Sequence, residues 1–259
     1  MLELAYVERH ERIAVLYINR PDARNCINAA TAAVMNRLFG ELQNDDGIDV
    51  VILTGKGDQA FSTGLDLKEL AENGPSLIPK VILPDTGWAG IGRRTFLKPI
   101  VSAVNGYAIA GGLELVLSTD FAIAADHAQL GFNEATLGPI ADAGGCFRLP
   151  HWVPLPIARE MLMTGRLLSA HEAHRVGLVN HVVPIGELMD KTFEIASLIQ
   201  RNSPSALRIM KCLINETLNQ PEALAWPIND RYMVASFDTP DFMEGPRAFA
   251  EKRVTRFRR

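Results

Sequence analysis

Cysteine is scarce in this sequence of 259 residues, which has only Cys26, Cys146 and Cys212 and no CxxC pair. This wide spacing argues against disulfide bonds and favours a reducing compartment, the cytoplasm. Each cysteine is most simply interpreted as a small buried hydrophobic residue. Long apolar runs are missing too, since none reaches the roughly 18 residues of a membrane span. The first residues, MLELAYVERHER, are charged and have no apolar core, so we expect no signal peptide.

The sequence also has no excess of positive charge. Its formal net charge is -4, which gives it no general attraction to nucleic acid or to anionic membranes. Any anionic ligand must therefore be held by local cations. His171 and His174 are close in the sequence but have no third ligand nearby, so the histidines predict no metal site.

Runs of β-branched and apolar residues alternate with helical patterns in the first two thirds of the chain, and only helical patterns follow. This order predicts an α/β core with a helical C-terminal extension. Several prolines and glycines make us expect an irregular, mobile segment over 74–92. The predicted strands are 12–19, 49–54, 99–104, 121–125 and 178–183. The predicted helices are 28–43 with Asn28 or Thr31 as cap, 66–72, 113–117, one that starts at Ser169 and runs to 177, 185–202, 204–218 with Ser203 as cap, 222–236, and 240–252 with Asp238–Thr239 as cap.

Glycine-rich turns follow several predicted strands. The turn within Val50–Phe61 has neither GxxxxGK[ST] nor, because of Ala60, a complete GxGxxG, so we reject nucleotide binding. Gly64 and the pair Gly111–Gly112 each precede a predicted helix. Either turn alone is most simply a tight turn. Together, two helix N-termini can aim two backbone N–H groups at one oxygen, as an oxyanion hole requires.

Two glutamates lie near these turns in the sequence. Glu114 is in the first turn of the helix after Gly111–Gly112, and Glu134 follows in LGFNEATLG. A pair of carboxylates can hold one water and divide the acid and base roles between them. An exposed or ion-paired glutamate is the commoner state of either residue. Spacing alone therefore gives a hypothesis of acid–base catalysis.

Sequence motifs along nearly the whole chain, in order, resemble those of the crotonase (enoyl-CoA hydratase/isomerase) family. They are NRPDARNCINAATAAVM, AFSTGLDLKEL, KPIVSAVNGYAIAGGLELVLSTDFAIAAD, LGFNEATLGPIADAGGCFRLP, LLSAHEAHRVGLVNHVV and EGPRAFAEKR. The resemblance implies a crotonase spiral of ββα units over 1–200 and a helical oligomerisation region over 201–259. That region forms trimers, which often pair into hexamers. The implied substrate is an acyl-CoA thioester, and no metal or redox cofactor is implied.

The same resemblance assigns roles to individual residues. The oxyanion hole would be the N–H groups of Leu65 and Gly111, and the catalytic pair would be Glu114 and Glu134. The residues implied in coenzyme A binding are Ala23, Arg24, Lys68, Phe249 and Lys252. The chain departs from the family pattern at three places, where Ala110 replaces a glycine and where Asn133 and Ala141 replace prolines.

The predicted function is hydration of a trans-2-enoyl-CoA. A Δ3–Δ2 enoyl-CoA isomerase needs only one base, and the presence of two glutamates argues against it. Gly87–Trp88 with Gly90, IAREMLMTGR and EGPRAFAEKR resemble carnitinyl-CoA dehydratases, which are an alternative function. A non-catalytic homologue that binds coenzyme A or RNA is opposed by the intact glutamates and the net charge of -4. Salt-dependent filter binding would test the RNA alternative.

Overall fold

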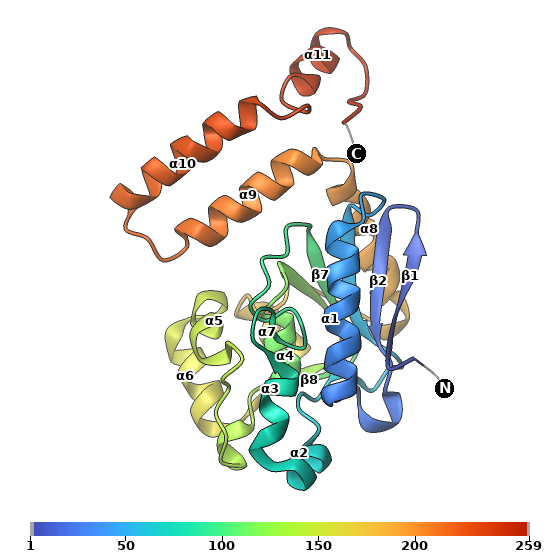
Figure 1. Ribbon diagram of the computed structural model, residues 1–259, viewed down its shortest axis with the longest axis vertical. Coiled ribbons are helices and arrows are strands. Elements are labelled where there is room, and N and C mark those ends of the chain that lie inside the picture. The colour runs from blue at the N-terminus through green and yellow to red at the C-terminus, as the bar shows by residue number, and fades with distance from the viewer. Residues whose placement is uncertain (1–2, 258–259) are drawn as a thin grey trace.

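The computed structural model describes residues 3–257, and its largest sheet has six strands. The outer pair, β1 and β2, is antiparallel, and every other neighbouring pair is parallel. Strand β1 was not predicted from the sequence. In sheet order the strands are β1 (Ala5–His10), β2 (Ile13–Ile18), β3 (Val50–Gly55), β7 (Ile100–Val104), β9 (Phe121–Ala125) and β12 (His181–Val183) (Figure 1).

A second sheet has four short strands in the order β11-β10-β8-β4. These are β4 (Ala60–Ser62), β8 (Tyr107–Ile109), β10 (Gln129–Gly131) and β11 (Leu167–Ser169). The chain repeatedly forms a strand in the large sheet, a strand in the small sheet and then a helix. Two such units are β3-β4-α2 and β7-β8-α4, where α2 is Leu67–Asn73 and α4 is Gly111–Val116. In a third unit, β9 and β10 are followed by a 3-10 helix, Glu134–Thr136. The α/β spiral of ββα units is therefore confirmed.

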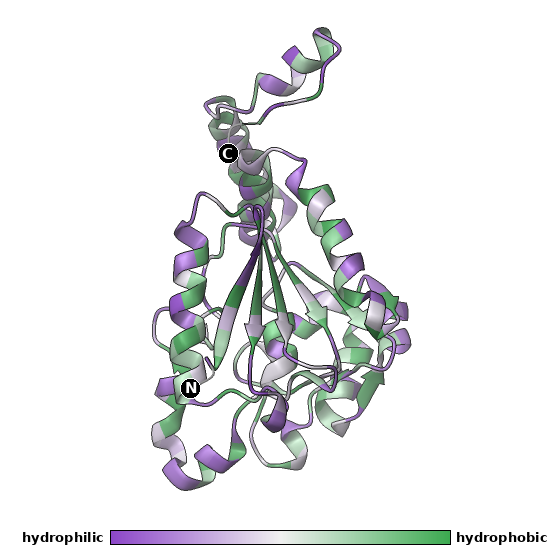
Figure 2. Ribbon diagram, turned by 90° about the vertical axis from the view of Figure 1, so that its right-hand side faces the viewer, coloured by the Kyte–Doolittle hydropathy of each residue, from purple (hydrophilic) through white to green (hydrophobic). Residues whose placement is uncertain are grey.

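Both faces of the six-stranded sheet are buried, which explains its nearly continuous apolar strands. On β2, Ala14 and Leu16 join the main core, which includes residues of α1 (Ala29–Asn44). The alternate residues Ile13 and Val15 join a second cluster with α8 (Leu188–Gln200). Figure 2 shows helices on both sides of the strands.

Most predicted helix caps are confirmed. Asn28 caps α1 by accepting a hydrogen bond from the Thr31 N–H, and Ser169 forms a capping box at α7 (Ala170–Arg175). Ser203 caps α9 (Pro204–Thr217). Further helices are α5 (Gly145–Trp152), α6 (Leu155–Thr164) and α10 (Glu222–Phe237), and a 3-10 turn lies at Ile185–Glu187.

The prediction of an irregular segment over 74–92 was wrong for most of its length. It forms a 3-10 helix (Gly74–Leu77), α3 (Ile78–Val81) and a hairpin of β5 (Ile82–Leu83) with β6 (Gly87–Trp88). Leu77, Val81 and Trp88 are buried in the main core and anchor these elements. Burial in tertiary structure thus replaces the missing local pattern.

Three other predictions were wrong in detail. The last helix, α11, is Glu244–Ala250 rather than 240–252, and it begins after Met243, so the predicted cap at Asp238–Thr239 was wrong; the buried Asp241 carboxylate instead accepts a hydrogen bond from Ser203 at the start of α9. The predicted strand 178–183 shrinks to β12, since the N–H of Leu178 bonds to the end of α7. Cys146 is exposed, although we expected a buried residue.

Helices α9, α10 and α11 project from the core on the side opposite α2 (Figures 1 and 2). A cleft of about 610 Å³ lies beside α9, and residues such as Phe96, Arg148 and Lys211 line it. The domain boundary near residue 200 stays a prediction. In the part of the chain from 3 to 257, no helix combines the length and the apolar character that crossing a bilayer requires.

Candidate active site

Three turns that carry predicted site residues follow neighbouring parallel strands. In the small sheet, β8 lies between β4 and β10 and is parallel to both. Parallel strands end at the same edge, so the segments that follow them meet there. Gly64 follows β4, Gly111 follows β8 and Glu134 follows β10. The fold thus gathers residues that lie far apart in the sequence.

The backbones at Gly64 and Gly111 touch each other. A Cβ atom added to Gly64, whose φ is +80°, would lie 2.7 Å from the Gly111 nitrogen. The bridge between Leu65 and Ile27 uses the Gly64 carbonyl and the Asp66 N–H, so the Leu65 N–H points to the opposite side. Neither the Leu65 nor the Gly111 N–H donates to another backbone group of residues 3–257. Two adjacent free donors suit an oxyanion hole.

Ala110 sets the direction of the second donor. Its carbonyl accepts hydrogen bonds from the N–H groups of Leu113 at 2.9 Å and Glu114 at 3.1 Å. The C=O and N–H of one peptide group point in opposite directions, so the Gly111 N–H points out of the start of α4. Ala110 has a φ of +55° and a ψ of −128°, a region that glycine enters freely and where a residue with a side chain costs about 1–3 kcal/mol. Ala110, which replaces a glycine of the family pattern, is therefore a strained residue.

Glu114 lies on α4 with its side chain inside the protein, at 3% exposure. One carboxylate oxygen, Oε1, accepts a hydrogen bond of 2.9 Å from the Gly145 N–H at the start of α5. The pKa of Glu114 is raised to about 7: burial is the largest cause, the charges of Glu134 and Asp142 add to it, and the hydrogen bond from the Gly145 N–H opposes them. A carboxyl group with such a pKa can exchange a proton near neutral pH.

Glu134 begins the 3-10 helix after β10 and is half-buried. Burial is the main cause that raises its pKa, and the charge of Asp142 adds to it. Its Oε2 atom is buried and has no hydrogen-bond partner within residues 3–257. A buried acceptor of this kind can bind a water or a substrate group. The charge of Glu134 also raises the pKa of Glu114, so the two carboxyl groups are near enough to interact.

Replacing Glu114 by Gln should stabilise the protein above pH 7. The folded pKa of about 7 exceeds the ordinary value of 4.5, so the folded state binds more protons between these values and loses stability as pH rises. Above pH 7 the buried charge costs at most about 3 kcal/mol. Glutamine carries no charge at any pH.

The measurement is urea unfolding of wild type and Glu114→Gln at pH 5 and pH 8, at one protein concentration. The increase in the free energy of unfolding that the substitution causes should be larger at pH 8 than at pH 5. The charged groups that act on Glu114, namely Glu134, Asp142 and Arg148, are retained in both proteins. An equal difference at the two pH values would contradict the raised pKa.

Comparison with known proteins now identifies the family. The model of the enoyl-CoA hydratase/isomerase family matches residues 8–259. This chain belongs to the enoyl-CoA hydratase/isomerase family. A carnitinyl-CoA dehydratase from Escherichia coli K12 is 38% identical over 98% of this chain and 97% of its own length. The crystal structure of an enoyl-CoA hydratase from Mycobacterium marinum is similar with a TM-score of 0.92, at 36% identity and with 99% of each chain covered. For an enoyl-CoA hydratase from Bacillus anthracis these values are 0.91, 33% and 98% of each chain.

The predicted coenzyme A residues fall into two groups. Ala23, Arg24 and Lys68 lie close to the candidate oxyanion hole: the Arg24 carbonyl accepts a hydrogen bond from Thr63 N–H, and Lys68 lies in the first turn of α2. Phe249 and Lys252 are exposed at the far end of the C-terminal helices, away from α2 (Figure 1). A single chain therefore does not bring all five residues together.

Sequence reasoning missed several contacts around the candidate site. Arg20 forms an ion pair of 2.9 Å with Asp66 and so ties the first loop to the cap of α2. The Gly145 N–H bonds to Glu114, and the indole of Trp88 bonds to the Gly111 carbonyl. The sequence signals for these contacts were the Gly144–Gly145 pair and the Gly87–Trp88 resemblance. Within residues 3–257, no group of His, Cys, Asp and Glu is arranged to hold a metal ion.

Proposed function

We propose that this chain is an enoyl-CoA hydratase, which adds water reversibly and in the syn sense to a trans-2-enoyl-CoA and forms a 3-hydroxyacyl-CoA. One observation carries the proposal. Glu114 and Glu134, both with raised pKa values and coupled charges, come from segments that meet beside the free N–H groups of Leu65 and Gly111. Family membership over residues 8–259 supports it.

In the proposed mechanism the thioester oxygen accepts hydrogen bonds from the N–H groups of Leu65 and Gly111. These bonds stabilise the negative charge that develops as the enolate forms. Glu114 takes a proton from the attacking water, whose oxygen bonds to the β-carbon, and Glu134 gives its proton to the α-carbon. This step needs Glu114 ionised and Glu134 protonated: a pKa of about 7 lets Glu114 take up a proton near neutral pH, and burial raises the pKa of Glu134, which favours its protonated form. Dehydration is the same path in reverse.

Turnover on a panel of enoyl-CoA and 3-hydroxyacyl-CoA thioesters tests this function. Hydration is followed by the loss of the absorbance of the conjugated thioester. We expect turnover of at least one trans-2-enoyl-CoA. An enzyme that moves a Δ3 double bond but adds no water would instead be an isomerase.

A carnitinyl-CoA dehydratase is the second candidate function. It is favoured by the 38% identity to carnitinyl-CoA dehydratases over 98% of the chain. The same residues would perform the reaction in the dehydration direction. The ratio of kcat/KM for carnitinyl-CoA to that for 3-hydroxybutyryl-CoA decides between the two, and a ratio well above one favours the second candidate.

Arg24→Ala and Lys252→Ala should each raise the KM for an enoyl-CoA by about fivefold to tenfold, with kcat nearly unchanged. We propose that both cations bind coenzyme A phosphates, a contact that is equal in the ground and transition states. Arg24 is exposed, and its guanidinium lies 5.8 Å from the centre of the Tyr107 ring. Steady-state kinetics with Arg37→Ala, on the exposed face of α1, provides the control. An unchanged KM in both variants would reject the assignment.

We propose a homotrimer or a dimer of trimers, built on the C-terminal helices. Light scattering at micromolar concentration should give the mass of three or six chains, and a stable monomer would contradict this. The reason is that α9 and α10 expose many large hydrophobic side chains that water solvates poorly. These include Met210, Ile214, Leu218, Leu224, Trp226, Met233, Val234 and Phe237.

We further propose a cytoplasmic location and a reaction without metal or redox cofactor. The three cysteines are free thiols, which suits a reducing compartment. Proton transfers between two carboxyl groups and a water need no electron carrier.

A further inference from the structure

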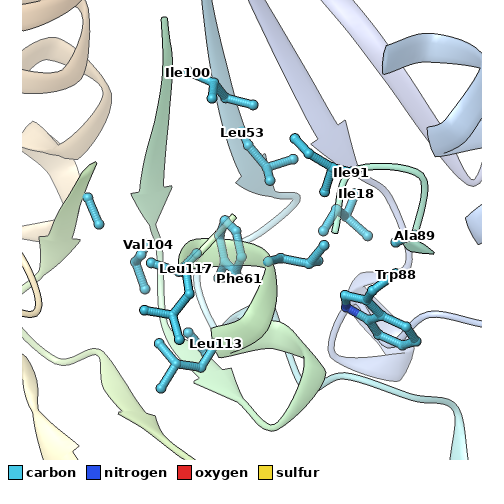
Figure 3. Close-up of a cluster of buried hydrophobic side chains, with 14 of the residues drawn as sticks. Ile18, Leu53, Phe61, Trp88, Ala89, Ile91, Ile100, Val104, Leu113 and Leu117 are labelled. Atoms are coloured by element: carbon cyan, nitrogen blue, oxygen red, sulfur yellow. The ribbon is translucent and has the colours of Figure 1, made fainter. Parts of the chain in front are cut away.

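The indole of Trp88 lies against the first residue of α4. Its Nε1–H donates a hydrogen bond of 2.8 Å to the Gly111 carbonyl, and the side chain is buried. A Cβ atom added to Gly111 would lie 2.5 Å from Cζ2 and 2.9 Å from Cε2 of the indole, so the ring packs directly on the Gly111 backbone. Figure 3 shows Trp88 beside Ala89, at the edge of the buried cluster that includes Leu113.

The loop that carries Trp88 is fixed to α1. Arg94 donates from Nε to the Gly90 carbonyl at 2.8 Å and from Nη2 to Asn36 Oδ1 at 2.7 Å. Thr86 donates to the same Asn36 oxygen at 2.9 Å. Both flanks of Trp88 are therefore held by one side chain of α1. The indole has little freedom to move away from Gly111.

These contacts hold Gly111 from several sides. The peptide group before it is fixed through the Ala110 carbonyl, which accepts from Leu113 and Glu114. The peptide group after it is fixed by Trp88, and Gly64 touches its other side. Glycine has no side chain of its own to restrict its backbone. The direction of the Gly111 N–H therefore depends on these neighbours.

We infer that Trp88 is a positioning residue of the oxyanion hole, whose indole holds Gly111 so that its N–H points at the thioester oxygen as charge develops there. This inference rests on the proposed function. A donor that is slightly misdirected still permits binding but stabilises the transition state less well. The expected effect is thus on kcat rather than on KM.

The first test is Trp88→Phe, which keeps a ring and removes the N–H donor. We expect kcat for hydration to fall about tenfold, less than the hundredfold or more for loss of an oxyanion donor itself, with KM changed less than twofold. The second readout is the absorption band of bound cinnamoyl-CoA, which shifts to the red when hydrogen bonds polarise its carbonyl. Trp88→Phe should reduce this shift. Trp152→Phe, which changes a half-buried tryptophan at the end of α5, is the matched control.

A closer test replaces the indole N–H by sulfur and leaves its shape unchanged. The chain has three tryptophans, so a Trp152→Phe, Trp226→Phe background leaves Trp88 as the single site for benzothienylalanine. This variant keeps the packing even if phenylalanine at position 88 impairs folding. We expect the same loss of kcat and of the red shift.

The outcomes separate this inference from the proposed function. A wild-type red shift retained in full by Trp88→Phe and by the sulfur isostere would overturn the positioning role, whatever happens to kcat. A wild type without any red shift would also overturn it. A wild type that shifts the band but hydrates no enoyl-CoA would remove the proposed function, and loss of that shift in both variants would still support the role of Trp88.

Discussion

Glu114→Gln and Glu134→Gln should each lower the rate of enoyl-CoA hydration by about three orders of magnitude. Glutamine keeps the volume of glutamate and one oxygen acceptor, so it still accepts the Gly145 N–H at position 114. It cannot take up or release the proton that the reaction transfers. Hydration is measured by the loss of enoyl-CoA absorbance at saturating substrate.

Binding should survive both substitutions. Coenzyme A affinity, measured by calorimetry, should change less than threefold, because neither carboxyl group is assigned to the nucleotide. Glu41→Gln, an exposed glutamate on α1, is the matched control and should keep normal activity. The double variant should be scarcely slower than either single variant, since groups that act as one unit fail together.

Different results point to the other functions. Near-normal activity of Glu114→Gln together with an inactive Glu134→Gln would favour an isomerase with one base. Independent, multiplying losses would contradict the shared role. A wild type that binds coenzyme A and turns over no thioester would favour a non-catalytic homologue.

The sequence predicted the long elements well because their signals are local. The apolar run of β3 and the cap of α1 at Asn28 can each be recognised from a few consecutive residues. By contrast β4, β8 and β10 are three residues long, too short for a periodic pattern to appear. These short strands carry the candidate site to one edge, so its assembly could not be derived from periodicity.

The candidate site also combines residues that have a local sequence signal with residues that have none. Glu114, Glu134, Gly64 and Gly111 were selected from turns and from the family resemblance, before any contact between them was visible. Trp88 was noted only as a subfamily feature, because its bond to Gly111 joins two segments with no shared local pattern. Contacts of this kind depend on the packing of the whole core.

Gly111→Val should lower the hydration rate at least a hundredfold, the usual loss when one oxyanion donor is removed. A side chain at position 111 would lie 2.5 Å from Trp88 Cζ2 and 3.2 Å from the Gly64 Cα, and it would therefore force apart the two turns that carry the N–H groups. The carboxyl groups of Glu114 and Glu134 would remain. The loss should appear in kcat, while coenzyme A binding persists.

Gly186→Val provides the control, because an added Cβ there meets no atom within 4 Å. Circular dichroism and coenzyme A binding must show that Gly111→Val is folded before its rate is interpreted. In the folded variant, the red shift of bound cinnamoyl-CoA should also be lost, since one of the two donors no longer reaches the carbonyl. Normal turnover with a normal red shift would place the oxyanion hole elsewhere. Normal binding with slow turnover and no shift would support the Gly111 N–H as a donor to the thioester, because turnover and the red shift both depend on that hydrogen bond whereas coenzyme A binding does not.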